Sequence, residues 1–242
     1  MKRRWIGGAW GIGLILLTAV LFSPVVATGQ YVAIDYMVSG SGTQSGTIVT
    51  DLDWDVITAN PHTTYAWNLP STIAIDLGGT GTAHIDGLSI GVKADPFIDF
   101  GFSARSANGP THFAFSSALL IVNPALTNAQ ASAWAQVIPG IGSSVVSGDF
   151  GSKVYNSEYN GGTTFATLVS APVYGYGYEV APSQSIPGQV SSMQVHWGLT
   201  VSGGGQASGN SDFTILGDVI PEPASVILLG LGSLALIRKH KV

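Results

Sequence analysis

Residues 31–42 read YVAIDYMVSGSG, and this stretch shows the pattern on which the fold prediction rests. A short apolar run over 31–38 is followed at once by serine and glycine over 39–42. Short runs of this kind that end in Gly, Pro, Asn or Asp are typical of strands joined by tight turns. Because the same alternation continues as far as residue 219, the sequence predicts an all-β domain.

Further strands are expected wherever a short apolar run lies between turn residues. They cover 46–57, 63–69, 72–77, 83–85, 88–92, 97–104, 112–122, 143–150, 153–156, 163–170, 173–180, 189–201 and 213–219. Asp86-Gly87 separates two of these runs, and this dipeptide favours the two-residue turn of a β-hairpin. Residues 202–209, which are mostly glycine and serine, are expected to form a flexible loop or linker.

One segment, residues 125–137, is predicted to be helical because it is rich in alanine. Thr127 or Asn128 can cap its first turn after Pro124, and Pro139-Gly140 closes it. Many short strands with one short helix favour a β-sandwich or jelly-roll-like domain, in which one face of each sheet is buried.

Charge is distributed unevenly along the chain. Of the nine Lys and Arg residues, only Lys93, Arg105 and Lys153 lie within residues 28–218. The same interval holds 13 of the 14 acidic residues, so its formal balance is −10. A surface of this sign repels nucleic acid, which excludes nucleic-acid binding. The absence of cysteine excludes disulfides, thiolate metal sites and cysteine nucleophiles.

The N-terminus has the three parts of a secretory signal. Lys2, Arg3 and Arg4 come before an apolar run over 5–22, and residues 23–27 (SPVVA) supply small side chains for cleavage after Ala27. We therefore predict a signal peptide over 1–27, with an uncut signal anchor as the alternative. Both predict that residues 28–218 form an exported β-rich domain.

A second composite signal occupies residues 219–242. It consists of a proline-flanked glutamate, an apolar run over 224–237 and a basic tail; the residues are Pro221, Glu222 and Pro223, then Arg238, Lys239 and Lys241. The prolines favour a helix that begins at or after Pro223. The apolar run would span about 21 Å as a helix, which is short for a hydrocarbon core of about 30 Å. We predict a short transmembrane helix with its basic tail on the cytoplasmic side, and a buried core helix is the alternative.

This order of elements resembles the PEP-CTERM sorting signal of Gram-negative bacteria, in which Pro-Glu-Pro precedes a short glycine-containing transmembrane helix and a basic end. The resemblance implies recognition by an exosortase, a membrane enzyme that cuts near the motif and releases or re-anchors the protein outside the cell. It implies a precursor in the inner membrane and a mature protein at the cell surface or in the extracellular matrix. It covers residues 219–242 only, and it implies nothing about the task of residues 28–218.

Tyr174, Tyr176 and Tyr178 alternate with glycine, so a strand would place three phenol rings on one face. Exposed rings of this kind can stack on sugars, which makes the three tyrosines a candidate site for polysaccharide. Packing of the rings over the core is the alternative.

Asp51, Asp53 and Asp55 alternate with Leu52, Trp54 and Val56. This period of two is that of a strand with its carboxylates in water. Carboxylate oxygens also suit Ca²⁺, so the three aspartates are a hypothetical calcium site. An EF-hand loop is excluded, because Val56 stands where that loop requires glycine.

Gly87-Leu88-Ser89-Ile90-Gly91 matches the G-x-S-x-G pattern of a serine hydrolase. That nucleophile elbow needs a helix after the serine, whereas residues 92–96 have no helical period. Nothing in the sequence places His112 or His196 beside Ser89 as a base. A hydrolase is therefore the third hypothesis, and no catalytic residue, cofactor or resident metal is predicted. The first hypothesis is a structural or adhesive protein of an exopolysaccharide layer, and the second is a carbohydrate-binding module with exposed aromatics.

Overall fold

A computed structural model describes residues 31–60, 62–171 and 175–219 of the chain. These residues are mostly strands, which confirms the predicted all-β class. In chain order the elements are β1 (Tyr31–Ser39), β2 (Thr43–Asp53), α1 (Trp54–Ala59), β3 (Tyr65–Asn68), β4 (Ile73–Asp76), a 3₁₀ turn (Gly78–Thr80), β5 (Thr82–Lys93), β6 (Phe97–Arg105), β7 (Thr111–Ser117), β8 (Leu120–Pro139), β9 (Val145–Gly148), β10 (Lys153–Tyr159), β11 (Thr163–Ser170), β12 (Gly177–Ser185), β13 (Val190–Val201) and β14 (Gln206–Val219).

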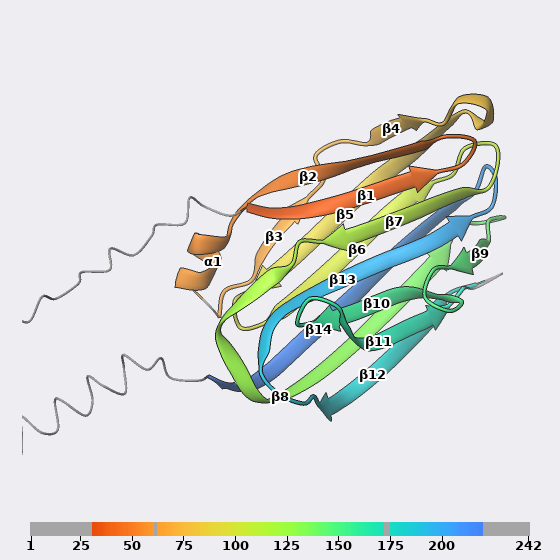
Figure 1. Cartoon of the computed structure of the whole chain (residues 1–242). Helices are drawn as coiled ribbons and strands as arrows, with labels where there is room; N and C mark the ends of the chain where they lie inside the picture. Colours follow the sequence, from red (N-terminus) through yellow and green to blue (C-terminus); the bar gives the residue numbers. More distant parts are fainter. Residues whose placement is uncertain (1–30, 61, 172–174, 220–242) are drawn as a thin grey trace, which may run out of the picture.

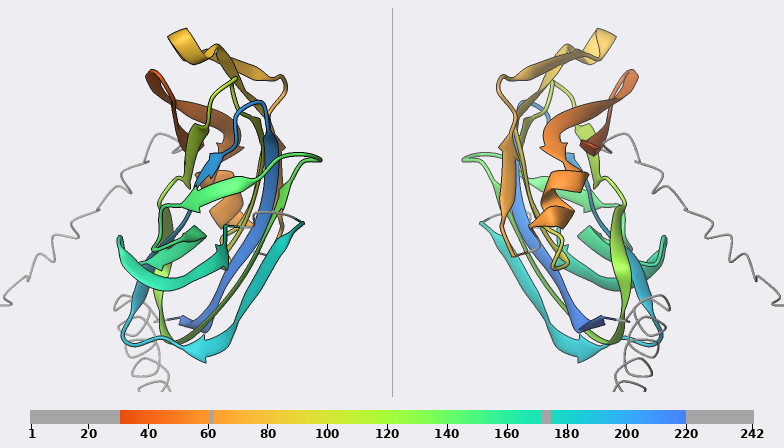
Figure 2. Two further views of the ribbon diagram at one scale, coloured as in Figure 1. Left: turned by 90° about the vertical axis from the view of Figure 1, so that its right-hand side faces the viewer. Right: turned by 90° about the vertical axis from the view of Figure 1, so that its left-hand side faces the viewer.

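In the described part of the chain, the strands join one sheet that folds over into two layers (Figures 1 and 2). The main path of the sheet runs β2-β1-β7-β13-β8-β14-β6-β5-β3. The first layer contains β2, β1, β7 and β13, with β9 and β10 paired to β13 and β11 paired to β10. The second layer contains β14, β6, β5 and β3, with β4 paired to β5 and β12 paired to β8.

Strand β8 connects the two layers, because its two halves pair with different strands. Its start pairs with β13 at Leu120 and Ile121, and its longer second half pairs with β14 as far as Pro139. Between the two halves, Asn128 has a φ of +51°, and the register with β14 shifts between Leu216 and Asp218. A positive φ at a residue other than glycine, together with a bulge, bends a strand. The bend turns the chain from one layer to the other.

Aromatic side chains fill the space between the layers. Phe102 of β6 packs against Phe115 and Trp197 of the first layer, with ring centroids 5.2 and 5.0 Å apart. The Tyr155 ring lies 5.1 Å from that of Trp197, and all four side chains are buried. Because burial of apolar surface is the main favourable term in folding, this interlayer contact holds the two layers together.

The helix predicted over residues 125–137 is wrong, because this segment lies within β8. Its alanines at 129, 131, 133 and 135 are buried, whereas Gln130, Ser132, Trp134 and Gln136 between them are not. Burial therefore has the period of two that belongs to a strand. The alanine content predicted a helix, but pairing with β14 and β12 on either side overrides that intrinsic preference.

The helix that the structure contains, α1, lies where a strand was predicted. The expected strand over 46–57 ends at Asp53, whose side chain accepts a hydrogen bond from the backbone N–H of Asp55 (2.9 Å). An aspartate in this position caps the first turn of a helix. The helix buries Ile57 and leaves Val56 about half exposed.

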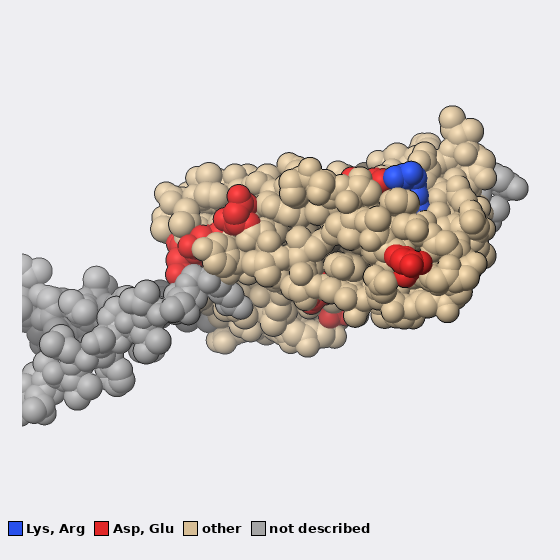
Figure 3. Space-filling view, turned by 90° about the horizontal axis from the view of Figure 1, so that it is seen from above, with Lys and Arg blue, Asp and Glu red and all other residues tan. Residues whose placement is uncertain are grey.

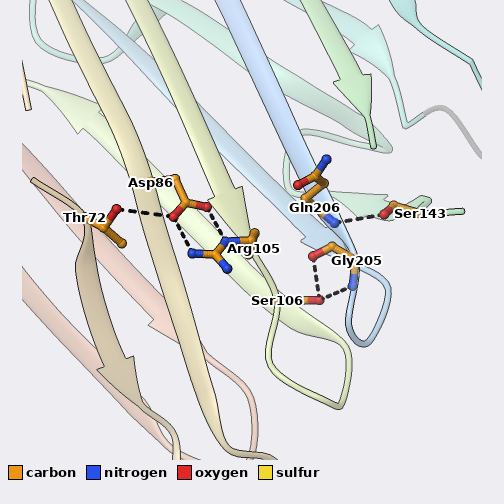
Figure 4. A network of polar contacts seen from close by, with 7 residues as sticks. All are labelled: Thr72, Asp86, Arg105, Ser106, Ser143, Gly205 and Gln206. Carbon is orange, nitrogen blue, oxygen red and sulfur yellow. Dashed lines mark hydrogen bonds and ion pairs between the residues drawn. The ribbon is translucent and has the colours of Figure 1, made fainter. Parts of the chain in front are cut away.

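The hairpin predicted at Asp86-Gly87 is also wrong, because β5 runs through this dipeptide. The pairing of β5 with β6 shifts register between Ile85 and Gly87, which is a β-bulge rather than a turn. The Asp86 carboxylate accepts two hydrogen bonds from Arg105, at 2.6 and 2.7 Å, and one from Thr72 at 3.4 Å (Figure 4). The hydrogen bonds from Arg105 lower the pKa of Asp86 below its usual value.

The loop expected over residues 202–209 is confirmed only in its first half, since β14 begins at Gln206. Ser106 Oγ donates to the Gly205 carbonyl (3.0 Å) and accepts from the Gly205 N–H (2.8 Å) (Figure 4). The Gln206 N–H donates to Ser143 Oγ at 2.9 Å. These bonds attach the turn before β14 to its neighbours on both sides.

Candidate functional site

Apart from Val219, the last residue of β14, the signals predicted at the two ends of the chain lie outside the described residues. This applies to the predicted signal peptide over 1–27, to the predicted transmembrane helix over 224–237, to the motif Pro221, Glu222 and Pro223, and to the basic tail with Arg238, Lys239 and Lys241. Within the described ranges, no helix is both long enough and apolar enough to cross a membrane.

The structure places two of the three candidate tyrosines. Tyr174 lies outside the described residues, whereas Tyr176, just before β12, is 69% exposed and Tyr178, within β12, is 52% exposed. The Tyr178 ring lies beside the Trp134 ring of β8, with centroids 6.1 Å apart and planes at 42°. Trp134 was not singled out from the sequence, because it lies inside the segment predicted to be a helix. The period of two in that segment would have marked it as outward-facing.

The three aspartates of the hypothetical calcium site do not gather around one point. Asp51 is exposed on β2, Asp53 caps α1 and Asp55 is exposed in the first turn of that helix. In the described part of the chain, no group of three or more His, Cys, Asp or Glu side chains is arranged to hold a metal ion.

Ser89 lies in the middle of β5, between Asn68 of β3 and Gly101 of β6. This is a paired strand position and not the strand-to-helix turn that a nucleophile elbow requires. The two candidate bases are hydrogen-bonded elsewhere. His112 Nε2 contacts the Asp149 carboxylate at 2.8 and 2.9 Å, and His196 Nδ1 lies 2.8 Å from Ser116 Oγ.

A separate polar group lies on the outer surface of the first layer and consists of Ser116, His196 and Glu158. His196 Nε2 lies 3.5 Å from Glu158 Oε2. Burial lowers the pKa of His196, and the nearby Glu158 carboxylate opposes this effect only in part. Ser116 belongs to a strand paired on both sides, with β1 and β13, so its backbone neighbours are engaged in ladders rather than directed at an oxyanion. We interpret the group as a polar link between strands.

The outer surface of the second layer carries a continuous row of polar positions. The ladders align one residue from each strand in the order Asn68 (β3), Ser89 (β5), Gly101 (β6), Asn210 (β14), Gln136 (β8) and Tyr178 (β12). The adjacent row contains Asp99 (β6), Asp212 (β14) and Trp134 (β8). We call this surface the polar face, defined by Asn68, Ser89, Asp99, Trp134, Gln136, Tyr178, Asn210 and Asp212.

The two carboxylates of the polar face belong to directly paired residues, Asp99 and Asp212. Trp134 Nε1 donates to Asp212 Oδ2, and the amide nitrogen of Asn210, in the orientation that satisfies its neighbours, donates to Asp99 Oδ1 at 3.1 Å. Burial raises the pKa of Asp99 to about 6, and the negative charge of Asp212 contributes to the shift. Burial also raises the pKa of Asp212, against the effect of the Trp134 hydrogen bond.

A hollow of about 380 Å³ opens on the same face, and its lining includes Asn68, Ser89, Ser103 and Asn210 but neither carboxylate. Gly101 forms part of its floor. A Cβ atom at Gly101 would lie 2.5 Å from Ser89 Oγ and 3.1 Å from the amide nitrogen that Asn210 directs at Asp99. Glycine at this position therefore allows the hydroxyl and the amide to converge over the strand.

Positive charge is scarce on the described surface. Arg105 is paired with Asp86 and Lys153 with Glu179, while Lys93 Nζ lies 5.2 Å from the centre of the Phe97 ring. On the face drawn in Figure 3, most of the surface is uncharged and acidic patches outnumber basic ones. In the described ranges, neither Asp99 nor Asp212 has a Lys, Arg or His partner within 4 Å.

Comparison with known families identifies the C-terminus. Residues 219–241 match the family model of the PEP-CTERM protein-sorting motif, which confirms the resemblance drawn from Pro221, Glu222 and Pro223. The chain thus carries the signal of an exported protein that an exosortase processes and sorts to the cell envelope or surface. No curated protein matches the chain.

Proposed function

We propose that the chain is the precursor of a surface or matrix protein whose β domain acts without catalysis, as a structural or adhesive component of an exopolysaccharide layer. One observation supports the sorting part of this proposal: the matched motif begins at residue 219, where β14 ends. Strand β14 is paired with β6 and β8 as far as Val219, so the sheet of the described domain ends at the first matched residue, ahead of Pro221, Glu222 and Pro223. Cleavage near Pro-Glu-Pro would therefore release a finished domain.

In this proposal the signal peptide over 1–27 is removed during export. Residues 224–237 then hold the precursor in the inner membrane, with Arg238, Lys239 and Lys241 on the cytoplasmic side. A short span of this kind is stabilised by local thinning of the bilayer and by flanking cations that reach the interface. Exosortase is the processing partner, and polysaccharide is the partner of the mature domain.

Replacement of Glu222 by Ala, or deletion of residues 224–242, tests the sorting step. We expect Glu222→Ala to accumulate as the membrane-held precursor and the deletion variant to lose normal processing and sorting, both with a folded β domain, as measured by the mass and cellular location of the protein. Ser225→Ala, a change of similar size just beyond the motif, is the matched control and should be processed normally. A normal mature mass and location in the Pro221→Ala and Glu222→Ala variants would contradict the assignment.

A second candidate function, carbohydrate binding, is favoured by the exposed rings of Tyr176 and Tyr178 and by the contact of Tyr178 with Trp134. Accessible aromatic rings offer flat apolar surfaces with a polar edge. Tyr178→Ala should then weaken retention of the mature protein on the extracellular polysaccharide of its own cells, as measured by co-sedimentation. Tyr31→Ala, which removes a half-exposed ring from the first layer, is the control.

A further inference from the structure

We infer that the polar face binds a polysaccharide that carries free amino groups, with sugar rings against Trp134 and Tyr178 and ammonium groups at Asp99 and Asp212. This inference rests on the carbohydrate-binding role proposed above, and it names both the residues of the site and the class of ligand.

The aromatic part of the site comes from two neighbouring strands. Tyr178 is about half exposed and Trp134 is partly exposed, and their ring centres lie 6.1 Å apart on the outer surface. Trp134 is held in place by the hydrogen bond from its Nε1 to Asp212. Because this bond fixes the indole before any ligand arrives, less conformational freedom is lost on binding.

The charged part of the site determines the class of ligand. Asp99 and Asp212 are paired across neighbouring strands, where like charges destabilise the sheet. In the described chain no cationic side chain within 4 Å compensates for either carboxylate. A ligand ammonium group would relieve this repulsion, and aromatic rings attract cations as well. A uronic acid polymer would be repelled by the same two carboxylates.

The extent of the face suits a chain-like ligand. Its polar row crosses six strands from Asn68 to Tyr178, a distance of about 24 Å at ~4.8 Å per strand. Along it, Asn68, Asn210 and Gln136 provide amide donors and acceptors, and Ser89 provides a hydroxyl beside the open hollow. Such groups bind the hydroxyls of successive sugar units.

Binding of defined oligosaccharides to the mature protein, purified after processing by the cell, tests the inference. The probes are glucosamine oligomers with free amines, N-acetylated glucosamine oligomers, cello-oligosaccharides and oligogalacturonates. Isothermal titration calorimetry at pH 7 measures the affinities. EDTA in the buffer prevents a divalent cation from bridging ligand and protein. We expect the free-amine oligomers to bind at least about tenfold more tightly than the acetylated and neutral ones, and oligogalacturonates to give no binding.

Four variants assign the effect to the face. Asp99→Asn/Asp212→Asn should abolish the preference for amines, and Trp134→Ala should weaken all binding. Trp134→Phe keeps an aromatic ring at this position. It should therefore retain part of the affinity that Trp134→Ala loses. Asp51→Asn removes an exposed carboxylate from the first layer and should change nothing. Thermal melting curves verify that each variant is folded.

The outcomes separate this inference from the proposed function. In one outcome the wild type binds aminated and neutral oligomers with equal affinity, and this binding is lost in Trp134→Ala but kept in the double aspartate variant. That result would overturn the choice of ligand and leave carbohydrate binding in place. Absence of binding to all four classes of oligosaccharide would overturn this inference together with the carbohydrate-binding role. Tight binding to oligogalacturonates would overturn the electrostatic argument.

Discussion

Lys153 Nζ lies 2.5 Å from Oε1 and 2.7 Å from Oε2 of Glu179, so one ion pair connects β10 of the first layer to β12 of the second. Glu179 Oε1 also accepts the backbone N–H of Ser170 on β11 (3.2 Å). In the described chain β11 is hydrogen-bonded in a ladder only to β10, and β12 only to β8. Side chains rather than a ladder thus close the sheet between β11 and β12.

Replacement of Glu179 by Gln should lower the free energy of unfolding by about 1–2 kcal/mol, because it leaves the half-buried Lys153 without its counter-charge. Urea denaturation at pH 7 measures the change. A double-mutant cycle with Lys153→Met then isolates the pair from the other effects of each substitution. Additive effects of the two substitutions would show that the ion pair does not stabilise the contact between β11 and β12.

The same pair predicts a response to acid. Burial alone would raise the pKa of Glu179, but the hydrogen bonds from Lys153 and from the Ser170 backbone outweigh burial and hold the pKa below its usual value. A carboxyl whose pKa is lowered by folding stabilises the protein above its unfolded pKa, and this contribution is lost as the pH falls through the folded pKa. Wild-type protein should therefore lose more stability than Glu179→Gln when the pH falls below about 4.5. Parallel pH profiles of the two proteins would contradict this prediction.

Gly209 provides a test of interlayer packing. A Cβ atom at this position would overlap the ring of Phe102, which belongs to the aromatic contact between the layers. Gly209→Ala should destabilise the protein by about 1–3 kcal/mol, since the core can accommodate the methyl group only by displacing the ring. Gly79→Ala, where a Cβ meets only Ser41 Oγ at 4.0 Å, is the matched control for denaturation experiments. Equal midpoints for the two variants would show that the ring moves freely.

The all-β class could be predicted from the sequence because strand pattern and turn residues are local properties. The run at 31–38 and the serine–glycine turn after it illustrate this, since β1 and its turn lie where they were expected. Local reasoning was wrong where tertiary contacts decide the outcome. Residues 125–137 have the composition of a helix but the burial period of a strand. Asp86-Gly87 has the chemistry of a turn but lies at a bulge opposite Ala104 and Ser103, where the Arg105 side chain binds Asp86.

The polar face could not be predicted, because its residues meet through a strand order that the sequence does not contain. Asp99, Trp134, Tyr178 and Asp212 are far apart along the chain, and only the order β12-β8-β14-β6 brings them together. Tyr178 was singled out by its spacing from neighbouring tyrosines. Its structural partner, Trp134, lies on a different strand that was expected to be a helix. The sorting motif was recognisable because its three parts follow one another in sequence.

Two substitutions in β8 test the period of two directly. Ala135 is fully buried against the other layer, whereas Ser132 lies on the outer surface and is partly exposed. Ala135→Leu should destabilise the protein by about 1–3 kcal/mol through overpacking. Ser132→Val should be tolerated to within about 0.5 kcal/mol, because β-branched residues suit an outward strand position. Tolerance of leucine at 135 would contradict the burial of this side of β8.

Replacement of Asp99 by Asn links the stability of the domain to its proposed ligand. Burial, with the charge of Asp212 on the paired strand, raises the pKa of Asp99 to about 6 from the 3.8 of a free aspartate. On the other side Asp99 faces Gly91 of β5, which brings no charge. Between pH 3.8 and 6 the folded state holds more protons than the unfolded state, so stability falls as the pH rises through this window.

Asp99→Asn should therefore be more stable than the wild type at pH 7, on the order of 1 kcal/mol after allowance for solvent screening, and equal to it near pH 3. Urea denaturation at both pH values measures the difference, and Asp95→Asn controls for the loss of an exposed negative charge. If Asp99→Asn gains stability but loses affinity for amino-sugar oligomers, the ionised carboxylate is unfavourable to folding and favourable to binding. Functional sites often lower the stability of a protein in this way. Equal stability of Asp99→Asn and wild type at pH 7 would contradict the raised pKa.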